Sequence, residues 1–425
     1  MESEVENPLA ELQKPVESLR SDPPLRPDPL TTDVAIVGGG LAGSLTAAML
    51  GRAGIDCVLI DPRTEYPPDF RCEKLDSVQV AILEKTGLAD LVLPASTPDR
   101  ECWISRQGLL VDKRPGDQRG IFYAPLVNTV RAHIPGNVRF INAKATALAN
   151  GPERQTVFTS LDQAISARLI VLANGLNVGL RDSLGLKREM LSVCHSISIG
   201  FDVKPVGGGE FPFSSLTHYA ERPNDRTALI TLFPIGQAMR ANLFVYRDMH
   251  DPWLQKFRAE PATTLFELMP GLRAVMGDFA VEDHVKIRPA DLYTTRGHLQ
   301  PGVVLVGDAF STSCPAAGTG VRKVLTDVER LCNVYVPKWL ATPGLGVDKI
   351  AEFYDDPIKR ACDDASIEKA RWVKAFTTNP AWTWEARRWL QFIAHYGAGK
   401  IRRLKAALLA FRIVRRPLRR RLPLS

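Results

Sequence analysis

A glycine-rich turn between an apolar run and a helical run constrains the fold more than any other feature of this sequence. The run VAIV after Asp33 is apolar and rich in β-branched residues, which predicts a buried strand. Gly38, Gly40 and Gly43 follow in GxGxxG spacing, and LAGSLTAAMLGRAG continues with the apolar period of a helix. DCVLID, which ends at Asp61, predicts a second strand. The segment therefore predicts a βαβ unit.

This βαβ unit predicts a site for the diphosphate of a dinucleotide. The first glycine permits the sharp turn, the second lets the backbone approach the diphosphate, and the third lets the helix pack on the strand. The free N–H groups at the start of the helix, at Leu41 and Ala42, would bind the diphosphate. Asp61 lies about twenty residues further on, where an acid accepts hydrogen bonds from an adenosine ribose. FAD and NAD both fit this pattern.

A second segment decides between the two cofactors. Residues 307–320, GDAFSTSCPAAGTG, follow the apolar run VVLV. They resemble the second FAD fingerprint of the FAD-dependent monooxygenase superfamily, which includes para-hydroxybenzoate hydroxylase and the ubiquinone-biosynthesis hydroxylases. The resemblance implies that Asp308 contacts the ribityl chain of FAD. It also implies that Pro315, Gly318 and Gly320 form a loop and helix start beside the isoalloxazine.

The resemblance extends from about residue 32 to about residue 365 and includes two arginines. Arg71, in RCEKL, stands where the family has an arginine against the FAD phosphates. Arg131, in LVNTVRAHI, matches an arginine that also touches the cofactor. For both arginines the alternative is a solvated surface charge. For Glu73 and Lys74, in the same RCEKL segment, a site role and a surface role remain equally open.

One departure from the family concerns the nicotinamide cofactor. The family has an Asp-Gly motif that is tied to both FAD and NAD(P)H, and this sequence has Asn174 and Gly175 there. Asn keeps a short polar side chain and tolerates the same tight backbone, so we expect the fold to persist. NAD(P)H is the expected reductant, although the changed motif leaves its use open. Gly207–Gly209 lack a strand-turn-helix context and predict a loop, not a second nucleotide site.

The pattern of apolar residues along the chain predicts an α/β fold. In this fold a Rossmann-type FAD-binding domain is interleaved with an antiparallel-sheet substrate domain and followed by a helical C-terminus. LSVCHSISIGFDV, RTALITLFPI and RANLFVY alternate or run apolar, as antiparallel strands do. The expected parts are a disordered leader at 1–30, an FAD-binding domain at 31–185 and 285–335, a substrate-binding sheet domain at 186–284, C-terminal helices at 336–398 and a basic amphipathic tail at 399–425.

Positive charge gathers at the C-terminus. From Arg387 onward there are twelve Lys and Arg and no Asp or Glu. These twelve positive charges exceed the net charge of +7 of the whole chain, so the residues before Arg387 are net acidic. Nucleic-acid binding is therefore not predicted. Ile401, Leu404, Leu408 and Phe411 lie at helical spacing opposite basic residues, a pattern typical of a helix on an anionic membrane. A helix docked on the protein is the alternative. Without a spanning run or a secretory signal, we expect a cytoplasmic protein, peripheral on the inner membrane.

The resemblance implies an FAD-dependent monooxygenase that uses O2 and NAD(P)H. It would hydroxylate or epoxidise a hydrophobic aromatic or isoprenoid substrate through a flavin C4a-hydroperoxide, so the hard chemistry belongs to the cofactor. No metal site is predicted, because the seven cysteines are spread singly through the chain. No catalytic residue is assigned. His195, His218 and Tyr219 could orient or deprotonate a phenol and Cys314 could act in redox chemistry, but packing is the favoured role of all four.

Three other hypotheses remain. An oxygen-independent flavin reductase of the geranylgeranyl-reductase kind is kept open by the changed Asp-Gly motif. A flavin halogenase is disfavoured, because Trp382 and Trp384 lead into EARRW and not into a WxWxIP signature. A membrane-binding protein with a vestigial flavin site is disfavoured by the two intact fingerprints.

Overall fold

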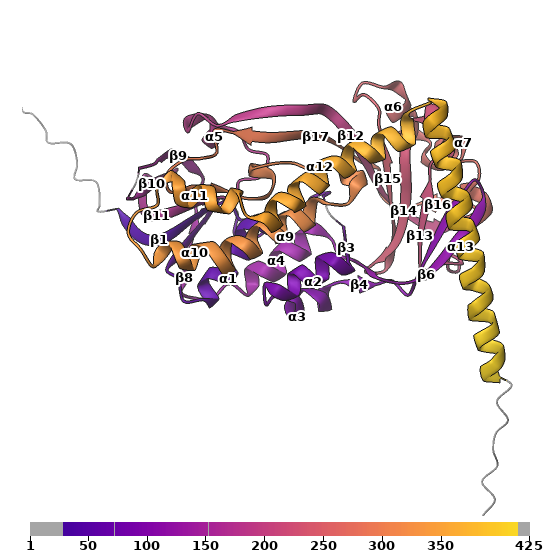
Figure 1. The fold of residues 1–425 in the computed structure, drawn as a ribbon, viewed down its shortest axis with the longest axis horizontal. Coiled ribbons are helices and arrows are strands. Elements are labelled where there is room, and N and C mark those ends of the chain that lie inside the picture. The colour runs from indigo at the N-terminus through magenta and orange to yellow at the C-terminus, as the bar shows by residue number, and fades with distance from the viewer. Residues whose placement is uncertain (1–28, 72, 152, 415–425) are drawn as a thin grey trace, which may run out of the picture.

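Two large β-sheets with helices packed on them form the protein (Figure 1). The computed structural model describes residues 29–71, 73–151 and 153–414, with side chains as far as residue 405. The expected leader at 1–30 therefore falls almost entirely outside the described residues. A small third sheet has the strand order β3 (Lys74–Asp76), β7 (Gln118–Gly120), β4 (Thr97–Pro98).

The first sheet has the order β8-β2-β1-β11-β10-β9, and β18 also pairs with β11. Its parallel strands are β1 (Leu30–Val37), β2 (Cys57–Asp61), β8 (Val138–Asn142), β11 (Ala164–Leu172) and β18 (Val303–Leu305), and its antiparallel strands are β9 (Ala145–Ala149) and β10 (Gln155–Thr159). The run 34–37 is buried on both faces, as the apolar sequence predicts for a strand covered by helices. The predicted βαβ unit is confirmed, with α1 (Leu41–Arg52) between the parallel strands β1 and β2.

Small and apolar residues let α1 lie in the interior, where residues 41–51 are all buried. It packs against α4 (Tyr123–Ala132) and α9 (Gly320–Arg330). The other helices of this part are α2 (Ser77–Lys85), α3 (Ala89–Val92) and α5 (Gly179–Ser183). The α2 helix has a capping box, because Asp76 accepts a hydrogen bond from the Gln79 N–H and the Gln79 side chain accepts one from the Asp76 N–H.

The second sheet has the order β16-β12-β15-β14-β13-β5-β6, and β17 also pairs with β12. Its strands are β5 (Glu101–Arg106), β6 (Leu109–Pro115), β12 (Lys187–Pro205), β13 (Ser215–Tyr219), β14 (Thr227–Ile235), β15 (Ala238–Val245), β16 (Phe279–Val281) and β17 (Lys286–Arg296). Side chains of one face, among them Ile199, Ile230 and Leu243, pack on the helices α6 (Pro252–Ala259), α7 (Pro261–Leu268) and α8 (Leu272–Met276). The opposite face is therefore free to line a site.

Four helices complete the chain: α10 (Val336–Leu340), α11 (Val347–Tyr354), α12 (Pro357–Thr378) and α13 (Trp382–Val414). The α12 helix packs on α9 and on β14, so it joins the two sheets, and α13 packs on β6 and then extends away from the protein (Figure 1). None of the helices within the described ranges is both long and apolar enough to cross a membrane.

Pairing of β5 and β6 with the second sheet was not predicted from the sequence. Residues 101–115 fall within the segment expected to belong to the FAD-binding domain, yet β5 pairs in parallel with β13. The expected boundary at 398–399 also lies inside the single helix α13. The division into domains stays a prediction. Sheet membership departs from it at β5 and β6, and also at β17, which lies within the expected FAD-binding segment 285–335 yet pairs with β12 of the second sheet.

Candidate functional site

The glycine turn has two tight positions and one open position. Gly38 has φ +101°, and a Cβ added there would lie 2.6 Å from the Ala173 carbonyl oxygen. A Cβ at Gly43 would lie 1.8 Å from the Gly38 carbonyl oxygen, so this glycine lets α1 pack on the turn. A Cβ at Gly40 would meet only the Tyr123 hydroxyl, at 3.8 Å. The first and third glycines are thus needed for packing, whereas Gly40 leaves space for a ligand beside its backbone.

Asp61 and Arg131 both reach this turn. Asp61 ends β2, and its carboxylate accepts a 2.6 Å hydrogen bond from the Gly39 N–H. Arg131, on α4, donates from Nε to the Gly39 carbonyl oxygen at 2.9 Å, and its Nη2 lies 3.4 Å from Asp61 Oδ1. A carboxylate and a guanidinium therefore stand together at the N-terminus of α1, where ribose hydroxyls and a diphosphate could bind.

The second predicted fingerprint begins directly after β18. Asp308 accepts a 3.2 Å hydrogen bond from Arg71, and its carbonyl oxygen accepts one from the Tyr293 hydroxyl at 2.8 Å. Gly318 has φ +67° and ends the short turn that starts at Pro315. The predicted residues Arg71 and Asp308, which are 237 positions apart in sequence, thus lie in direct contact.

A cavity of about 490 Å³ lies between this loop and the second sheet. Six of the predicted cofactor-binding residues line it: Leu41, Arg71, Asp308, Pro315, Gly318 and Gly320. The other six surround the glycine turn instead: Gly38, Gly40, Ala42, Gly43, Asp61 and Arg131. Leu41 joins the two groups, because its N–H donates to the hydroxyl of Tyr123, which also lines the cavity.

The sheet face of the cavity carries a polar row and an apolar row. Thr217, Thr231 and Asn242 are directly opposite one another on β13, β14 and β15. Two residues along the strands, Leu229 and Phe244 form a neighbouring pair on the same face. Within the described residues, the Thr231 hydroxyl and the Asn242 side-chain oxygen are buried without a hydrogen-bond partner. They can therefore bind a polar group of a ligand.

A buried cluster with two carboxylates and one guanidinium lies beside the polar row, because Arg240 is two residues from Asn242 on β15 and therefore on the same face of the sheet. Arg240 Nε is 3.4 Å from Glu73 and 3.2 Å from Asp202. Burial raises the pKa of Glu73, against the opposing effects of Arg240 and of a hydrogen bond from Asn242. Burial also raises the pKa of Asp202, although Arg240 opposes this as well. Of these three charged residues, only Glu73 lines the cavity.

The candidate orienting residues do not line this cavity. His218 is buried between the Ser105 hydroxyl and Glu221, at 2.8 and 3.1 Å, and therefore has a packing role. Burial lowers the pKa of His195, whose ring packs edge-on against the Tyr246 ring. Cys314 is buried beside Ser196, and burial raises the pKa of its thiol, as expected for an unreactive cysteine.

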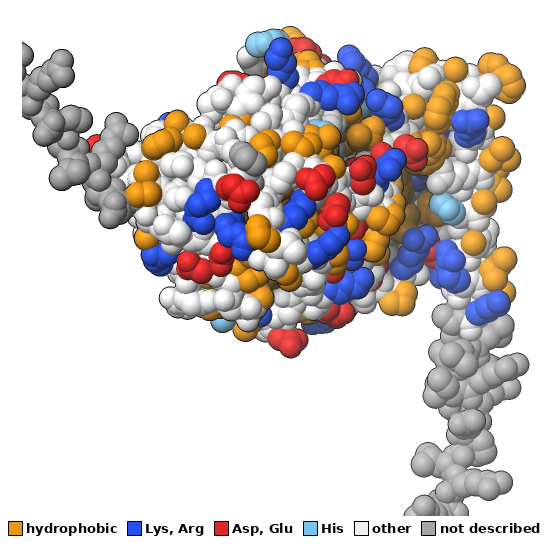
Figure 2. All heavy atoms as spheres, turned by 60° about the vertical axis from the view of Figure 1, so that its left-hand side comes forward, with side chains coloured by type: hydrophobic (Ala, Val, Ile, Leu, Met, Phe, Trp, Pro, Cys, Tyr) orange, Lys and Arg blue, Asp and Glu red, His pale blue; other side chains and the backbone are white. Residues whose placement is uncertain are grey.

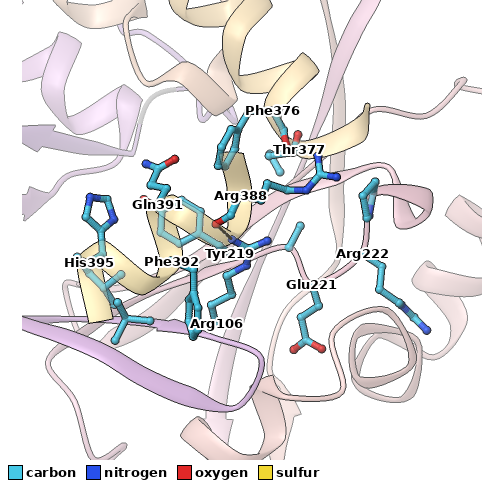
Figure 3. Close-up of a pocket in the computed structure, with 15 residues that line it drawn as sticks. Arg106, Tyr219, Glu221, Arg222, Phe376, Thr377, Arg388, Gln391, Phe392 and His395 are labelled. Carbon is cyan, nitrogen blue, oxygen red and sulfur yellow. Dashed lines mark hydrogen bonds between the residues drawn. The ribbon is translucent and has the colours of Figure 1, made fainter. Parts of the chain in front are cut away.

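Tyr219 lines a different, smaller pocket between the second sheet and α13 (Figure 3). In it Arg106 faces Arg388, whose guanidinium donates to the carbonyl oxygens of Phe376 and Asn379 at the end of α12. Arg388 thus joins α13 to α12. The pocket is therefore a small gap between packed elements.

Asn174 and Gly175 form a tight turn after β11. Gly175 has φ +58°, and the Asn174 amide donates to the Asn177 carbonyl oxygen at 3.1 Å. The tight backbone that an Asn-Gly pair tolerates is therefore present at this turn. The next residue, Leu176, lines the cavity.

Sequence analysis missed the polar row and two cavity residues, Tyr123 and Tyr293. The signal for the row is present: Thr231 and Asn242 are polar positions with an apolar neighbour on each side in their strands. A polar side chain inside such a strand indicates a face that is not packed on a core.

Comparison with known proteins links this geometry to flavin enzymes. A family model described as an FAD binding domain matches residues 31–119. The ubiquinone hydroxylase UbiL of Rhodospirillum rubrum is 26% identical over 366 residues, which cover 77% of this chain and 78% of that protein. The 3-demethoxyubiquinol 3-hydroxylase of Escherichia coli is 24% identical over 331 residues, with 72% and 80% covered. The p-nitrophenol 4-monooxygenase PnpA of Pseudomonas putida superposes with a TM-score of 0.70 at 18% identity, with 90% of this chain and 98% of that chain covered.

Proposed function

This chain belongs to the FAD-dependent monooxygenase superfamily, and from this premise we propose that it oxygenates a hydrophobic substrate with a polar head. The single observation that carries the substrate class is the cavity wall, in which a polar row of side chains adjoins an apolar one. FAD is the cofactor, O2 is the co-substrate, and NAD(P)H is the proposed reductant. The reaction is hydroxylation of an aromatic ring or epoxidation of an isoprenoid double bond.

Two clusters of the chain fit FAD. Space beside Gly40, with Asp61 and Arg131 at the same turn, suits a diphosphate and an adenosine ribose. Asp308 and Arg71, at the edge of the cavity, suit the ribityl and phosphate groups. FAD, when bound, supplies the electron transfer and the activation of oxygen. These two clusters would hold it, with the Asp308 cluster at the edge of the cavity.

The substrate is held by the sheet face opposite this loop. Leu229 and Phe244 bind its apolar body, while Thr231 and Asn242 bind its polar head. Apolar contacts exclude water from the reacting carbon and thereby protect the oxygenation step. The chain's own residues therefore act by binding and orientation.

Isotopically labelled O2 tests the proposal. Holoenzyme reduced by NADPH or NADH is given a panel of phenols, quinols and isoprenoids, and the products are analysed by mass spectrometry. Incorporation of one labelled oxygen atom supports the proposal. Equal product formation without O2 would favour the reductase hypothesis. Reduced flavin that yields only peroxide with every substrate would refute oxygenation of the classes tested.

We also propose that α13 holds the protein on an anionic membrane. Trp389, Leu390, Ile393, Ile401 and Leu404 are large apolar residues on this helix with exposed side chains. Figure 2 shows apolar and basic side chains next to one another above the grey C-terminal residues. Such a surface combines burial of apolar groups with attraction to anionic lipid. The predicted contacts Leu408 and Phe411 lie outside the residues whose side chains are described.

Vesicle co-sedimentation tests the membrane proposal. Protein cut before Lys400 is expected to lose binding to anionic vesicles while it retains FAD, and binding of the full chain is expected to weaken only partly in high salt. Leu390→Ser with Ile393→Ser is expected to weaken binding in the full-length chain. Leu109→Ser, an exposed apolar position on β6, is the matched control. Equal sedimentation of the full-length, truncated and doubly substituted proteins would leave α13 as a docked surface helix.

A further inference from the structure

The cavity wall contains a carboxyl group that substrate binding alone does not explain. Glu73 is 4% exposed and lines the cavity, yet its ion-pair partner Arg240 is shared with Asp202. The fully buried guanidinium of Arg240 balances one carboxylate. Lys286 also acts on both carboxylates, but its side chain is exposed and pairs with Asp283, so negative charge exceeds positive charge in the buried part of the cluster. Placing an uncompensated charge in a protein interior is costly, and the cluster therefore has a strong affinity for a proton.

We propose that Glu73 accepts the proton of an ionisable hydroxyl on the substrate, so that the proper substrate is a phenol, a hydroquinone or an enol. This inference rests on the proposed function and narrows its substrate class from hydrophobic compounds in general to those with an acidic hydroxyl. The neighbouring Thr231 hydroxyl, which has no partner among the described residues, would bind the same oxygen.

The proton transfer is balanced. The O–H bond of the substrate breaks, a bond from that proton to a Glu73 carboxylate oxygen forms, and no electrons are gained or lost. The negative charge moves to the substrate oxygen, where the Thr231 hydroxyl can donate a hydrogen bond. An oxygen anion enriches its ring in electrons and activates it for oxygenation. Glu73 returns the proton to the same oxygen before the product leaves.

Charged groups from three strands act on Glu73. Arg240 on β15 and Lys286 on β17 favour its carboxylate form, whereas Asp202 on β12 favours its protonated form. Burial opposes the carboxylate most strongly, and the pKa of Glu73 is raised in consequence. A carboxylate with a raised pKa is a stronger base and accepts the proton of a weakly acidic hydroxyl more readily. Removal of Asp202 is expected to weaken Glu73 as a base, although Asp202 does not line the cavity.

The test uses 4-nitrophenol, because the neutral and ionised forms of this probe have different absorption bands. It is added to oxidised full-length holoenzyme at a pH where the free probe is neutral. Wild type is expected to show the ionised band on binding. Glu73→Gln is expected to lose roughly tenfold in the ionised-to-neutral ratio of bound probe. Asp202→Asn is expected to give an intermediate ratio.

Two outcomes would overturn the proposal. Glu73→Gln with the ionised band of wild type would do so, and so would wild type that fails to bind the probe. 4-Nitroanisole, in which a methyl group replaces the hydroxyl proton, has no proton to give and should bind both proteins with affinities that agree within about twofold. Failure of the proposed function is distinguishable, because labelled oxygen in the product of a substrate without a hydroxyl would uphold oxygenation while refuting the role of Glu73.

Discussion

Two alanine substitutions in the glycine turn should separate cofactor binding from folding. In Gly40→Ala the new Cβ meets no atom closer than the Tyr123 hydroxyl at 3.8 Å. Gly40 is the N-cap of α1 with φ −71°, a conformation open to alanine. Loss of a favourable cap and gain from a less flexible unfolded chain each amount to about 1 kcal/mol and oppose one another. The free energy of unfolding of the apoprotein should therefore change by less than about 1 kcal/mol.

FAD affinity should respond differently in Gly40→Ala. The methyl group would take space beside the backbone that the diphosphate needs, and crowding of this kind costs about 1–3 kcal/mol. The dissociation constant for FAD should rise roughly 5- to 150-fold. Apoprotein titrated with FAD, followed by quenching of flavin fluorescence, gives this constant, and urea unfolding of the apoprotein gives the stability.

Gly43→Ala is the matched control. Its Cβ would lie 1.8 Å from the Gly38 carbonyl oxygen, which is backbone and cannot rotate away. Destabilisation should exceed about 3 kcal/mol, with loss of FAD as a secondary effect of unfolding. If Gly40→Ala binds FAD as tightly as wild type, or if both substitutions destabilise equally, the distinct roles assigned to the two glycines are wrong.

Further predictions concern buried charge. Lys359→Met removes the ammonium group 2.8 Å from buried Asp327 and should cost about 3–5 kcal/mol in urea unfolding, and a loss below about 1 kcal/mol would contradict this. Burial opposes ionisation of Asp112, but hydrogen bonds led by that of Arg402 hold its pKa below the ordinary value. The stabilisation that Asp112 gives to the packing of α13 on β6 should therefore be fully present above that ordinary pKa, and it should be lost as pH falls through the lowered pKa. Asp112→Asn should speed proteolysis of α13 at neutral pH. Because the pKa of Glu73 is raised in the folded state, the contribution of this residue to folding stability is fully present below the ordinary pKa of 4.5. That contribution is lost as pH rises through the raised pKa. Glu73→Gln should therefore gain thermal stability relative to wild type with rising pH, and parallel curves of Tm against pH would disprove this.

Local sequence predicted the parts of the fold that depend on neighbouring residues. The run VAIV, the three glycines and Asp61 lie within one βαβ unit, so spacing alone predicts how they meet. Pairing of β5 with β13 joins Ile104 to Thr217 across more than a hundred residues, and no local pattern encodes the partner of a strand. The resemblance led to Arg71 and Asp308, whereas spacing could not have shown their contact.

The role of Glu73 was out of reach of sequence analysis for a similar reason. Its environment is made by Arg240 and Asp202, which come from strands far along the chain. Its charge alone is typical of a surface residue, and only burial against a shared guanidinium makes it unusual. The exposed apolar face of α13 was predicted only from Ile401 onward, because in the sequence Leu390 and Ile393 do not differ from residues that pack in a core.

Interleaving of the two sheets has a consequence for how the protein is made. The first sheet lacks β18 until residue 305 has been synthesised, and the second lacks β17 until residue 296. A nascent chain that ends before these points exposes open edges of β11 and β12, which can pair with other chains. Such long-range pairing also slows folding, because distant segments must meet before either sheet is complete. Vectorial synthesis therefore leaves both sheets incomplete until residue 296, and chains stalled before this residue should be strong clients of chaperones.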